Sequence, residues 1–381
     1  MTSIERIAAL FAGEFPDKPP LMHISFSSRS ASIILGREAY VGGGIQQWRE
    51  AKSLWQGPDA HAEFIERGRQ DAIAIAIACD HDMIRTSYWS DKRKPVKRID
   101  EYTFRYEDTD GNWEVKQLDP VTELYNTVSQ SPRQELTLED LPAIIAQNEA
   151  QTETYDATKD DCDDAKYMIN TVGNRMAIRA AAPWTCIPIS NPVWLEATMI
   201  APELVVRYLD AQLTISLKKL EFAVSLGLQY FFVGGDFASN QGPMYSPQVF
   251  HELMLPRLKK VSEACHRMGV YHLFGTDGNV WPVAEDLYRA SGIDGHYEFD
   301  RRAGMNPIEV HEKYPHLVMV GNISSHTLHT GMPADVEREV HECLDEAHQT
   351  NKVITGCSNI IISETPAKNI EAMMNAIARY R

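Results

Sequence analysis

Side chains with acid–base, metal-binding or substrate-binding chemistry lie within or just after short apolar segments of this chain. In sequence order they are Arg29, Asp80, His81, Trp184, Asp236, His272, Asp277, His296, Glu298, Asn322 and Cys357. Imidazole and thiolate groups favour zinc, and a carboxylate can supply the last ligand of such a site. The mixture therefore predicts a divalent transition metal if these residues share one cavity. A purely polar substrate pocket is the alternative, because each residue alone also has an ordinary structural role.

Short apolar segments alternate with helical patterns, and these elements would have to bring the polar side chains together. The segments expected to form β-strands are 21–26, 71–79, 175–182, 230–235, 270–274, 295–299, 317–321 and 352–355. Eight β units separated by helices is the count of a (β/α)8 barrel, the α/β fold also called a TIM barrel. In that fold the C-terminal ends of the strands meet at one mouth, where catalytic residues collect.

An open, doubly wound parallel sheet is the rival architecture. That fold normally carries a glycine-rich fingerprint after its first strand. The segment 21–30, LMHISFSSRS, contains no glycine. We therefore expect one (β/α)8 barrel domain over residues 1–381, with an N-terminal helical extension at 1–20.

The pattern changes between residues 88 and 119, where polar and apolar residues alternate. Such alternation is typical of half-buried antiparallel strands, and Asp110-Gly111 is typical of a tight hairpin turn. We expect a small antiparallel insertion after the second strand, near the mouth of the barrel, within an inserted region of about 88–170.

The charge and composition exclude several classes of partner. A formal net charge of −16 would repel phosphate backbones and anionic lipids, so we expect neither a nucleic-acid nor a membrane partner. Six cysteines without a CxxC pair, and a start without a basic, apolar leader, predict a reduced, cytoplasmic protein. No apolar stretch reaches the ~20 residues that span a bilayer. A homo-oligomer is compatible with the sequence, which carries no signal for or against it.

Three stretches resemble one known family. GGDFASNQGPMYSPQVFHELMLPRLKKV, GTDGNVWPVAEDLYRASGIDGHYEFD and GCSNIIISETPAKNIEAMMNAIARY are similar to the C-terminal half of the uroporphyrinogen decarboxylase superfamily. The resemblance covers about residues 175–381 and implies a (β/α)8 barrel. It also implies one of two kinds of enzyme: a uroporphyrinogen decarboxylase, or a cobalamin-dependent methyltransferase that serves methanogenesis or anaerobic demethylation.

Two departures from the decarboxylase pattern favour the methyltransferase branch. Decarboxylases resemble one another in a pair of arginines after the first strand, whereas Arg29 stands here without that partner. They also share a Gly-His pair before the terminal Glu-Thr-Pro, where this chain has the residues 356–359, GCSN. A tetrapyrrole with many carboxylates needs a cationic cradle, and these departures remove it.

The methyltransferase resemblance implies a zinc site. Enzymes of methanol and methylamine metabolism resemble one another in a His-x-Cys-Gly pair after the fifth strand and in a late cysteine, all on zinc. His272 matches the histidine of this pair and Cys357 matches the late cysteine. Phe274 occupies the position of the cysteine in His-x-Cys-Gly. Asp277 belongs to an Asp-Gly-Asn turn similar to that of the demethylase-like branch. We therefore expect zinc on His272, Asp277 and Cys357, with Glu298 as an alternative carboxylate and a metal-free site as the other alternative.

The predicted activity is that of a corrinoid-dependent methyltransferase, a demethylase component that moves a methyl group to a corrinoid protein. The methyl donor would be a small methylated substrate such as a methoxylated aromatic or a methylamine. Breaking such a bond needs an acid or a Lewis acid at the leaving group, so Asp236, Asp277 and Glu298 are the catalytic candidates. The substrate-binding candidates are Arg29, Asp80, His81, Trp184, His296 and Asn322. A uroporphyrinogen-decarboxylase-like decarboxylase and a barrel that only binds a ligand or partner are the alternatives.

Overall fold

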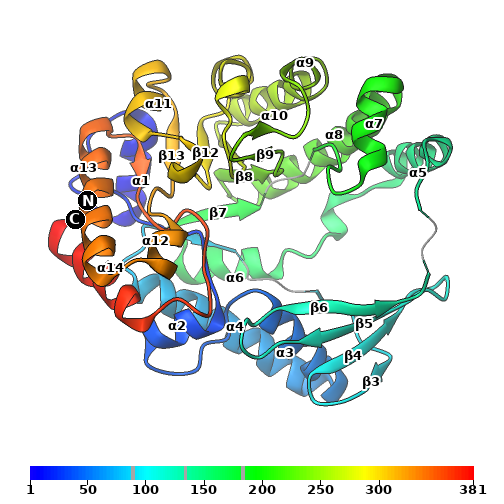
Figure 1. The fold of residues 1–381 in the computed structure, drawn as a ribbon, viewed down its shortest axis with the longest axis horizontal. Coiled ribbons are helices and arrows are strands. Elements are labelled where there is room, and N and C mark those ends of the chain that lie inside the picture. The colour runs from blue at the N-terminus through cyan, green and yellow to red at the C-terminus, as the bar shows by residue number, and fades with distance from the viewer. Residues whose placement is uncertain (87–90, 133–134, 182–184) are drawn as a thin grey trace.

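The structure is a computed structural model that describes residues 1–86, 91–132, 135–181 and 185–381. Parallel strands lie at its centre and helices cover them on the outside (Figure 1). One sheet of seven strands has the order β14-β13-β12-β11-β8-β7-β2. Its strands are β2 (Met83–Arg85), β7 (Ala177–Ala181), β8 (Tyr230–Gly234), β11 (Tyr271–Gly275), β12 (Gly295–Tyr297), β13 (Val318–Val320) and β14 (Val353–Ile354). Two further strands, β1 (Ser25–Phe26) and β15 (Ile360–Ile361), pair with each other in parallel.

The segment 21–26 closes this sheet into a barrel. Leu21 forms a parallel bridge with Thr355, just beyond β14, and its carbonyl accepts the Asp82 N–H, just ahead of β2, at 2.9 Å. The first strand therefore lies between the two edges of the seven-stranded sheet. The predicted (β/α)8 barrel is confirmed.

Apolar side chains pack on both sides of the barrel wall because successive strand residues point to opposite faces. One cluster fills the interior, and Leu273, Phe232 and Tyr297 belong to it. Two larger clusters lie between the strands and the helices. The helix α1 (Ser3–Ala12) closes the N-terminal end of the barrel, since its Ile7 and Leu10 join the interior cluster.

Most of the outer helices begin where the sequence supplies a cap or an early proline, which a first helical turn tolerates. They are α2 (Ser28–Leu35), α3 (Gly44–Gln56), α4 (Pro58–Ala78), α5 (Leu141–Thr154), α6 (Asp163–Val172), α7 (Pro192–Ile200), α8 (Pro202–Ser225), α9 (Pro247–Val249), α10 (Leu255–Arg267), α11 (Pro307–Lys313), α12 (Ser325–Thr330), α13 (Pro333–Thr350) and α14 (Ala367–Tyr380). Within the described ranges, no helix combines the length and apolar character needed to cross a bilayer.

The segment 71–79 is not the second strand, so that prediction is wrong. It forms the last turns of α4, and the strand is the shorter β2 that follows. The alternation of isoleucine and alanine suggested a period of two, but the buried positions Ala72, Ile75, Ala76 and Cys79 follow helical spacing, while Ile77 is exposed. Alanine has the highest helix propensity, and the helix can pack its alanine-rich face closely against the barrel.

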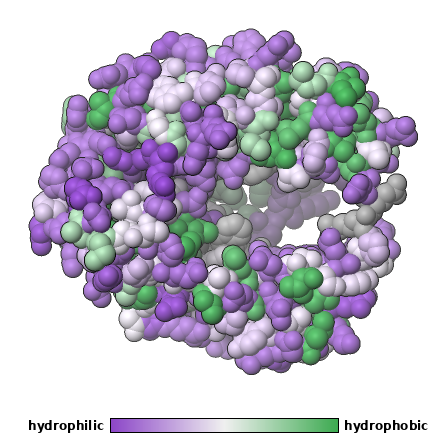
Figure 2. Space-filling view, viewed as in Figure 1, coloured by the Kyte–Doolittle hydropathy of each residue, from purple (hydrophilic) through white to green (hydrophobic). Residues whose placement is uncertain are grey.

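The predicted antiparallel insertion is confirmed after β2. It is a four-stranded sheet of β3 (Lys97–Arg98), β4 (Thr103–Glu107), β5 (Trp113–Leu118) and β6 (Tyr125–Gln130). Trp48 of α3 packs against its apolar face. Figure 2 shows a hollow in the middle of the molecule, and the arrow of β7 in Figure 1 points towards it. The C-terminal mouth of the barrel therefore opens towards this hollow.

The opposite end of the barrel is held by one buried carboxylate. Asp82 is fully buried, and its side chain accepts hydrogen bonds from Arg6, Arg381 and the Leu21 N–H, the last at 2.9 Å. Arg6 also bonds Asp17 at 2.7 Å. This carboxylate therefore joins α1, the first strand and the C-terminal residue.

Replacing Asp82 with asparagine is expected to lower the free energy of unfolding by about 3–5 kcal/mol, because two buried guanidinium groups lose their shared counter-charge. Urea unfolding followed by circular dichroism measures the change. Asp345→Asn is the matched control, since that carboxylate is exposed and pairs with His341 at the surface. We expect the control to stay within about 0.5 kcal/mol of the parent, and equal losses in the two variants would contradict the role of Asp82.

Candidate active site at the mouth of the barrel

Three carboxylates meet at the mouth of the barrel. Asp236 follows β8, Asp277 follows β11 and Glu298 follows β12. These strands are parallel neighbours whose last residues are in register, so the residues after them reach the same edge. A carboxylate oxygen of each residue lies within 4.8 Å of the other two. The structure thus brings the three predicted catalytic residues together, and their roles stay a prediction.

The ring of Tyr297 lies across the strand ends next to these carboxylates. A Cβ atom on Gly275 would come within 2.0 Å of the Tyr297 ring, and one on Gly234 within 2.4 Å of its hydroxyl. Only glycine at both positions lets the ring lie so close to the backbone of β8 and β11. The ring forms part of the floor of the site.

The turn that carries Asp277 is fixed on both sides. Gly278 has a φ of +90°, and a Cβ atom there would lie 2.7 Å from the Ser239 carbonyl. The Asn279 N–H donates to that same carbonyl at 2.8 Å. The side-chain amide of Asn359 donates to Oδ2 of Asp277 at 2.8 Å. The carboxylate is therefore oriented by a residue from the far end of the chain.

Glu298 has an unusual backbone conformation. Its φ is +65°, in the left-handed region that residues with a side chain rarely adopt. Such a conformation costs of order 1–3 kcal/mol and recurs at functional sites, where the surrounding structure enforces it. Here it turns the chain directly after β12 and places the carboxyl beside Asp277.

Burial and mutual repulsion keep two of the carboxyl groups protonated at higher pH than usual. Burial raises the pKa of Glu298 to about 7, with the charge of Asp277 acting in the same direction and that of Arg179 opposing it. Burial, followed by the charges of Asp236 and Asp300, raises the pKa of Asp277 to about 6. These two groups titrate as a coupled pair. Near neutral pH the site therefore holds a proton that it can donate.

Two arginines lie on the strands next to the carboxylates. Arg85 of β2 and Arg179 of β7 are direct partners in the parallel register. The guanidinium of Arg179 lies over the rings of Phe232 and Tyr297, with its central carbon 4.6 and 4.8 Å from the ring centroids. Both positive charges act on Glu298 and lower its pKa against the effect of burial. The mouth therefore combines acids and cations.

The expected zinc ligands His272, Asp277 and Cys357 are not brought together. His272 is fully buried on the outer side of β11, where its Nδ1 pairs with the Ser262 hydroxyl of α10 at 2.8 Å. Cys357 is buried in an apolar cluster between the barrel and the helices. Where the structure describes the chain, potential ligand atoms within 4.8 Å of one another form two other groups. The expected set therefore has no geometric support.

Of the predicted substrate-binding residues, Asp80, His81 and Asn322 do not face the three carboxylates. Asp80 and His81 precede β2, at the opposite end of the barrel, so their assignment to the mouth fails together with the strand at 71–79. Arg29 is exposed on α2, and Asn322 is buried with its amide bonded to the Cys343 carbonyl at 3.1 Å. Trp184 lies outside the described residues.

His296 supports the site from behind. It is fully buried, its Nδ1 accepts the Tyr288 hydroxyl at 2.7 Å, and its Nε2–H donates to the Thr276 carbonyl at 3.0 Å. Thr276 directly precedes Asp277. His296 therefore positions the acidic turn and does not face the mouth itself.

Four residues near the carboxylates were not assigned from the sequence: Arg85, Arg179, Tyr297 and Asn359. Arg179 lies inside a segment correctly expected to be a strand, and a charged residue in an apolar strand was a usable signal. Arg85 had no such signal, because the strand that contains it was placed too early. Tyr297 and Asn359 owe their importance to contacts with residues far away in the sequence.

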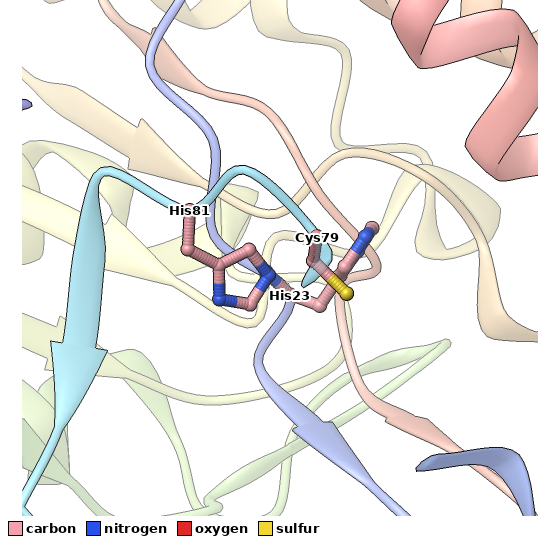
Figure 3. Close-up of side chains that lie close together, drawn as sticks. All are labelled: His23, Cys79 and His81. Carbon is pink, nitrogen blue, oxygen red and sulfur yellow. The ribbon is translucent and has the colours of Figure 1, made fainter. Parts of the chain in front are cut away.

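A second group of potential metal ligands lies on the outer side of the first strand: His23, Cys79 and His81 (Figure 3). The Nδ1 atom of His23 accepts the Cys357 N–H at 2.9 Å, while its Nε2 is buried without a partner. Nε2 of His81 accepts the His23 N–H at 3.1 Å. Burial lowers the pKa of His23 to about 4 and raises that of Cys79 to about 12. The donor set is compatible with zinc.

The family of the chain follows from its C-terminal half. The family model of uroporphyrinogen decarboxylase (URO-D) matches residues 180–380. This range exceeds half of the 381 residues and contains Asp236, Asp277 and Glu298. The chain therefore belongs to the uroporphyrinogen decarboxylase family, and the resemblance stated from the sequence is confirmed. No curated protein matches the chain by sequence.

Two solved structures illustrate the similarity of the fold. A methyltransferase from Methanosarcina mazei matches 100% of this chain and 99% of its own, with 17% identity and a TM-score of 0.65. The 3-keto-D-glucoside 4-epimerase from E. coli matches 65% of this chain and 95% of its own, with 11% identity and a TM-score of 0.35. The first likeness shows a shared fold over the whole chain, and the second is too weak to support an argument.

The raised pKa of Glu298 predicts a specific dependence of stability on pH. Between its unfolded value of 4.5 and its folded value of about 7, the folded state binds more protons at this group than the unfolded state does. The contribution of Glu298 to stability is therefore present below pH 4.5 and is lost as the pH rises through 7. Glu298→Gln should gain stability relative to the parent protein between pH 5 and pH 8, by of order 2 kcal/mol.

Urea unfolding of the parent and of Glu298→Gln at both pH values measures this difference. Glu309→Gln on the surface of α11 is the control, and it should follow the parent at both pH values. A constant difference between Glu298→Gln and the parent across this range would contradict the raised pKa.

Proposed function

We propose that this protein is a corrinoid-dependent methyltransferase. It would take a methyl group from a small methylated substrate and pass it to a corrinoid bound by a separate protein. The observation that carries the proposal is the acid at the mouth: Glu298, with a pKa raised to about 7, lies beside Asp277 and Asp236. Membership of the uroporphyrinogen decarboxylase family and the fold shared with a methyltransferase from Methanosarcina mazei support it.

The chemistry of demethylation explains why such an acid is useful. When the bond between the methyl group and oxygen or nitrogen breaks, the electron pair remains on the heteroatom, which is then a poor leaving group unless it gains a proton. Glu298 can give that proton at neutral pH, and the neighbouring Asp277 can restore it. The corrinoid supplies the nucleophile that accepts the methyl group. Asp236 is exposed and Asp277 and Glu298 are only half-buried, so a substrate can reach the carboxylates.

The mouth does not fit the zinc site expected from the sequence. Its grouped donors, Asp236, Asp277 and Glu298, are all oxygen ligands, whereas the expected site needed imidazole and thiolate. We place zinc at His23, Cys79 and His81 instead. The proximity of their ligand atoms, all within 4.8 Å of one another, and the preference of zinc for imidazole and thiolate support this placement. Zinc there would join the first strand to the turn between α4 and β2, and its role would be structural.

Zinc analysis of the purified protein tests this placement. Cys79→Ser is expected to reduce the zinc content from about one ion per chain to near zero, because the thiolate ligand is lost. Cys357→Ser is the matched control, since that buried cysteine lies outside the group, and it should keep the metal. Parent protein without zinc, or zinc retained in Cys79→Ser, would contradict the placement.

Methyl transfer to a reduced corrinoid protein tests the proposed activity. The protein is incubated with methoxylated aromatics and methylamines, and the absorbance of the corrinoid reports methylation. Glu298→Gln should lower the rate by about 10²–10⁴-fold, because it removes the proton donor. The rate of the parent protein should fall as the pH rises through about 7, where Glu298 loses its proton.

Glu309→Gln, on the surface of α11, should keep the rate of the parent. Absence of methyl transfer with every donor would contradict the proposed function. A Glu298→Gln variant with the full rate and an unchanged pH profile would contradict the assigned acid.

A decarboxylase acting on a small acid is the second candidate. Arg85 and Arg179 favour it, because guanidinium groups bind carboxylates. Release of carbon dioxide from a carboxylic acid, without a corrinoid protein, would distinguish this activity from methyl transfer.

A further inference from the structure

Most of the buried or half-buried arginines in the described part of the chain have a carboxylate within 4.0 Å. Eight of them do: Arg6, Arg49, Arg67, Arg69, Arg105, Arg257, Arg301 and Arg381. In the part of the chain that the structure describes, Arg179 has no such ion pair. Its Nη1 atom is buried and has no hydrogen-bond partner. A buried cationic donor left in this state costs free energy that a bound anion would recover.

The side chain of Arg179 points into the barrel. The two aromatic rings that its guanidinium contacts, those of Phe232 and Tyr297, belong to the interior cluster. Tyr297 also packs against the C-terminal ends of β8 and β11 at the mouth. Stacking on two aromatic faces fixes the plane of the guanidinium, while its Nη1 atom stays without a hydrogen-bond partner. The group is therefore oriented in advance for a ligand.

A second positive charge lies beside it. Arg85 is paired with Arg179 in the register of β2 and β7, and like charges at directly paired positions of neighbouring strands destabilise a sheet. Glu298 acts electrostatically on this pair, but its raised pKa means that it carries a proton for part of the time at neutral pH. An anion bound at Arg179 would therefore lie next to a second positive charge.

We propose that Arg179, with Arg85 beside it, binds a carboxylate group of the substrate. This inference rests on the proposed function and narrows it: the methyl donor is a methylated carboxylic acid, such as a methoxybenzoate, and not a neutral ether or a free methylamine. A planar guanidinium can hold a carboxylate through two parallel hydrogen bonds. The carboxylate at the arginines and the leaving group at Glu298 then fix the substrate at both ends. A cationic methylamine would be repelled by the same arginines.

Direct binding measurements test the subsite without a corrinoid protein. Isothermal titration calorimetry compares 4-methoxybenzoate with 4-methoxybenzamide, which has nearly the same shape and no charge. We expect the parent protein to bind the benzoate at least ~10-fold more tightly than the amide, because only the benzoate supplies a charge-assisted bidentate pair. This comparison needs no variant. Equal affinities would overturn the inference.

Arg179→Gln separates the subsite from general attraction of anions. The variant should lose about 10- to 100-fold in affinity for the benzoate and little for the amide, since a charge-assisted pair contributes roughly 1.5–3 kcal/mol. Arg207→Gln is the control, because that exposed arginine pairs with Glu149 on the surface. It should bind both ligands like the parent. An Arg207→Gln variant that loses as much affinity as Arg179→Gln would also overturn the inference.

The failure of this inference and that of the proposed function are distinguishable. If uncharged methoxyaromatics or methylamines are demethylated while the benzoate binds no better than the amide, the carboxylate subsite is wrong and the methyltransferase stands. If the benzoate binds through Arg179 but no donor is demethylated, the subsite stands and the proposed reaction is wrong.

Discussion

Repulsion among Asp236, Asp277 and Glu298 is the constraint on which the rest of the site depends. A parallel barrel brings the C-terminal ends of adjacent strands to one rim, so carboxylates that follow β8, β11 and β12 cannot avoid one another. Burial strengthens their interaction because the local dielectric is low. Burial, with this repulsion acting in the same direction, raises the pKa of Asp277 to about 6 and that of Glu298 to about 7, so the site holds protons near neutral pH.

The surrounding residues maintain this arrangement at some cost in stability. Glu298 keeps a left-handed backbone, two glycines admit the ring of Tyr297, and Asn359 fixes Asp277 by a hydrogen bond. At the opposite end of the barrel the charged residues stabilise the fold. There Asp82 neutralises two arginines and ties both ends of the chain to the barrel. Stabilising contacts and unfavourable charges are thus placed at opposite ends of the same strands, as is usual in this fold.

Much of the fold was readable in the sequence because apolar strand segments and capped helices are local signals. The positions of Asp236, Asp277 and Glu298 could be predicted for the same reason, because each of them follows a strand that was predicted correctly. The segment 71–79 failed because isoleucine and alanine fit both a strand and a helix, and only packing against the barrel decides between them.

The predicted ligands His272, Asp277 and Cys357 are not grouped in the structure, for a different physical reason. His272 lies in the expected strand, but alternate residues of a barrel strand face opposite sides, and Leu273 is the one that faces inwards. The sequence does not state which alternate set is inside. The unpaired state of Arg179 was equally hidden, because the absence of a nearby carboxylate is a property of the assembled barrel.

The protonation of the carboxyl pair tests the central claim most directly. Carboxyl groups of glutamate and aspartate can be labelled with carbon-13 and followed by NMR as the pH changes, with Glu298→Gln and Asp277→Asn used to assign the signals. The account predicts two coupled transitions, at about 6 and about 7. Transitions of both groups near their ordinary values of 3.8 and 4.5 would contradict it.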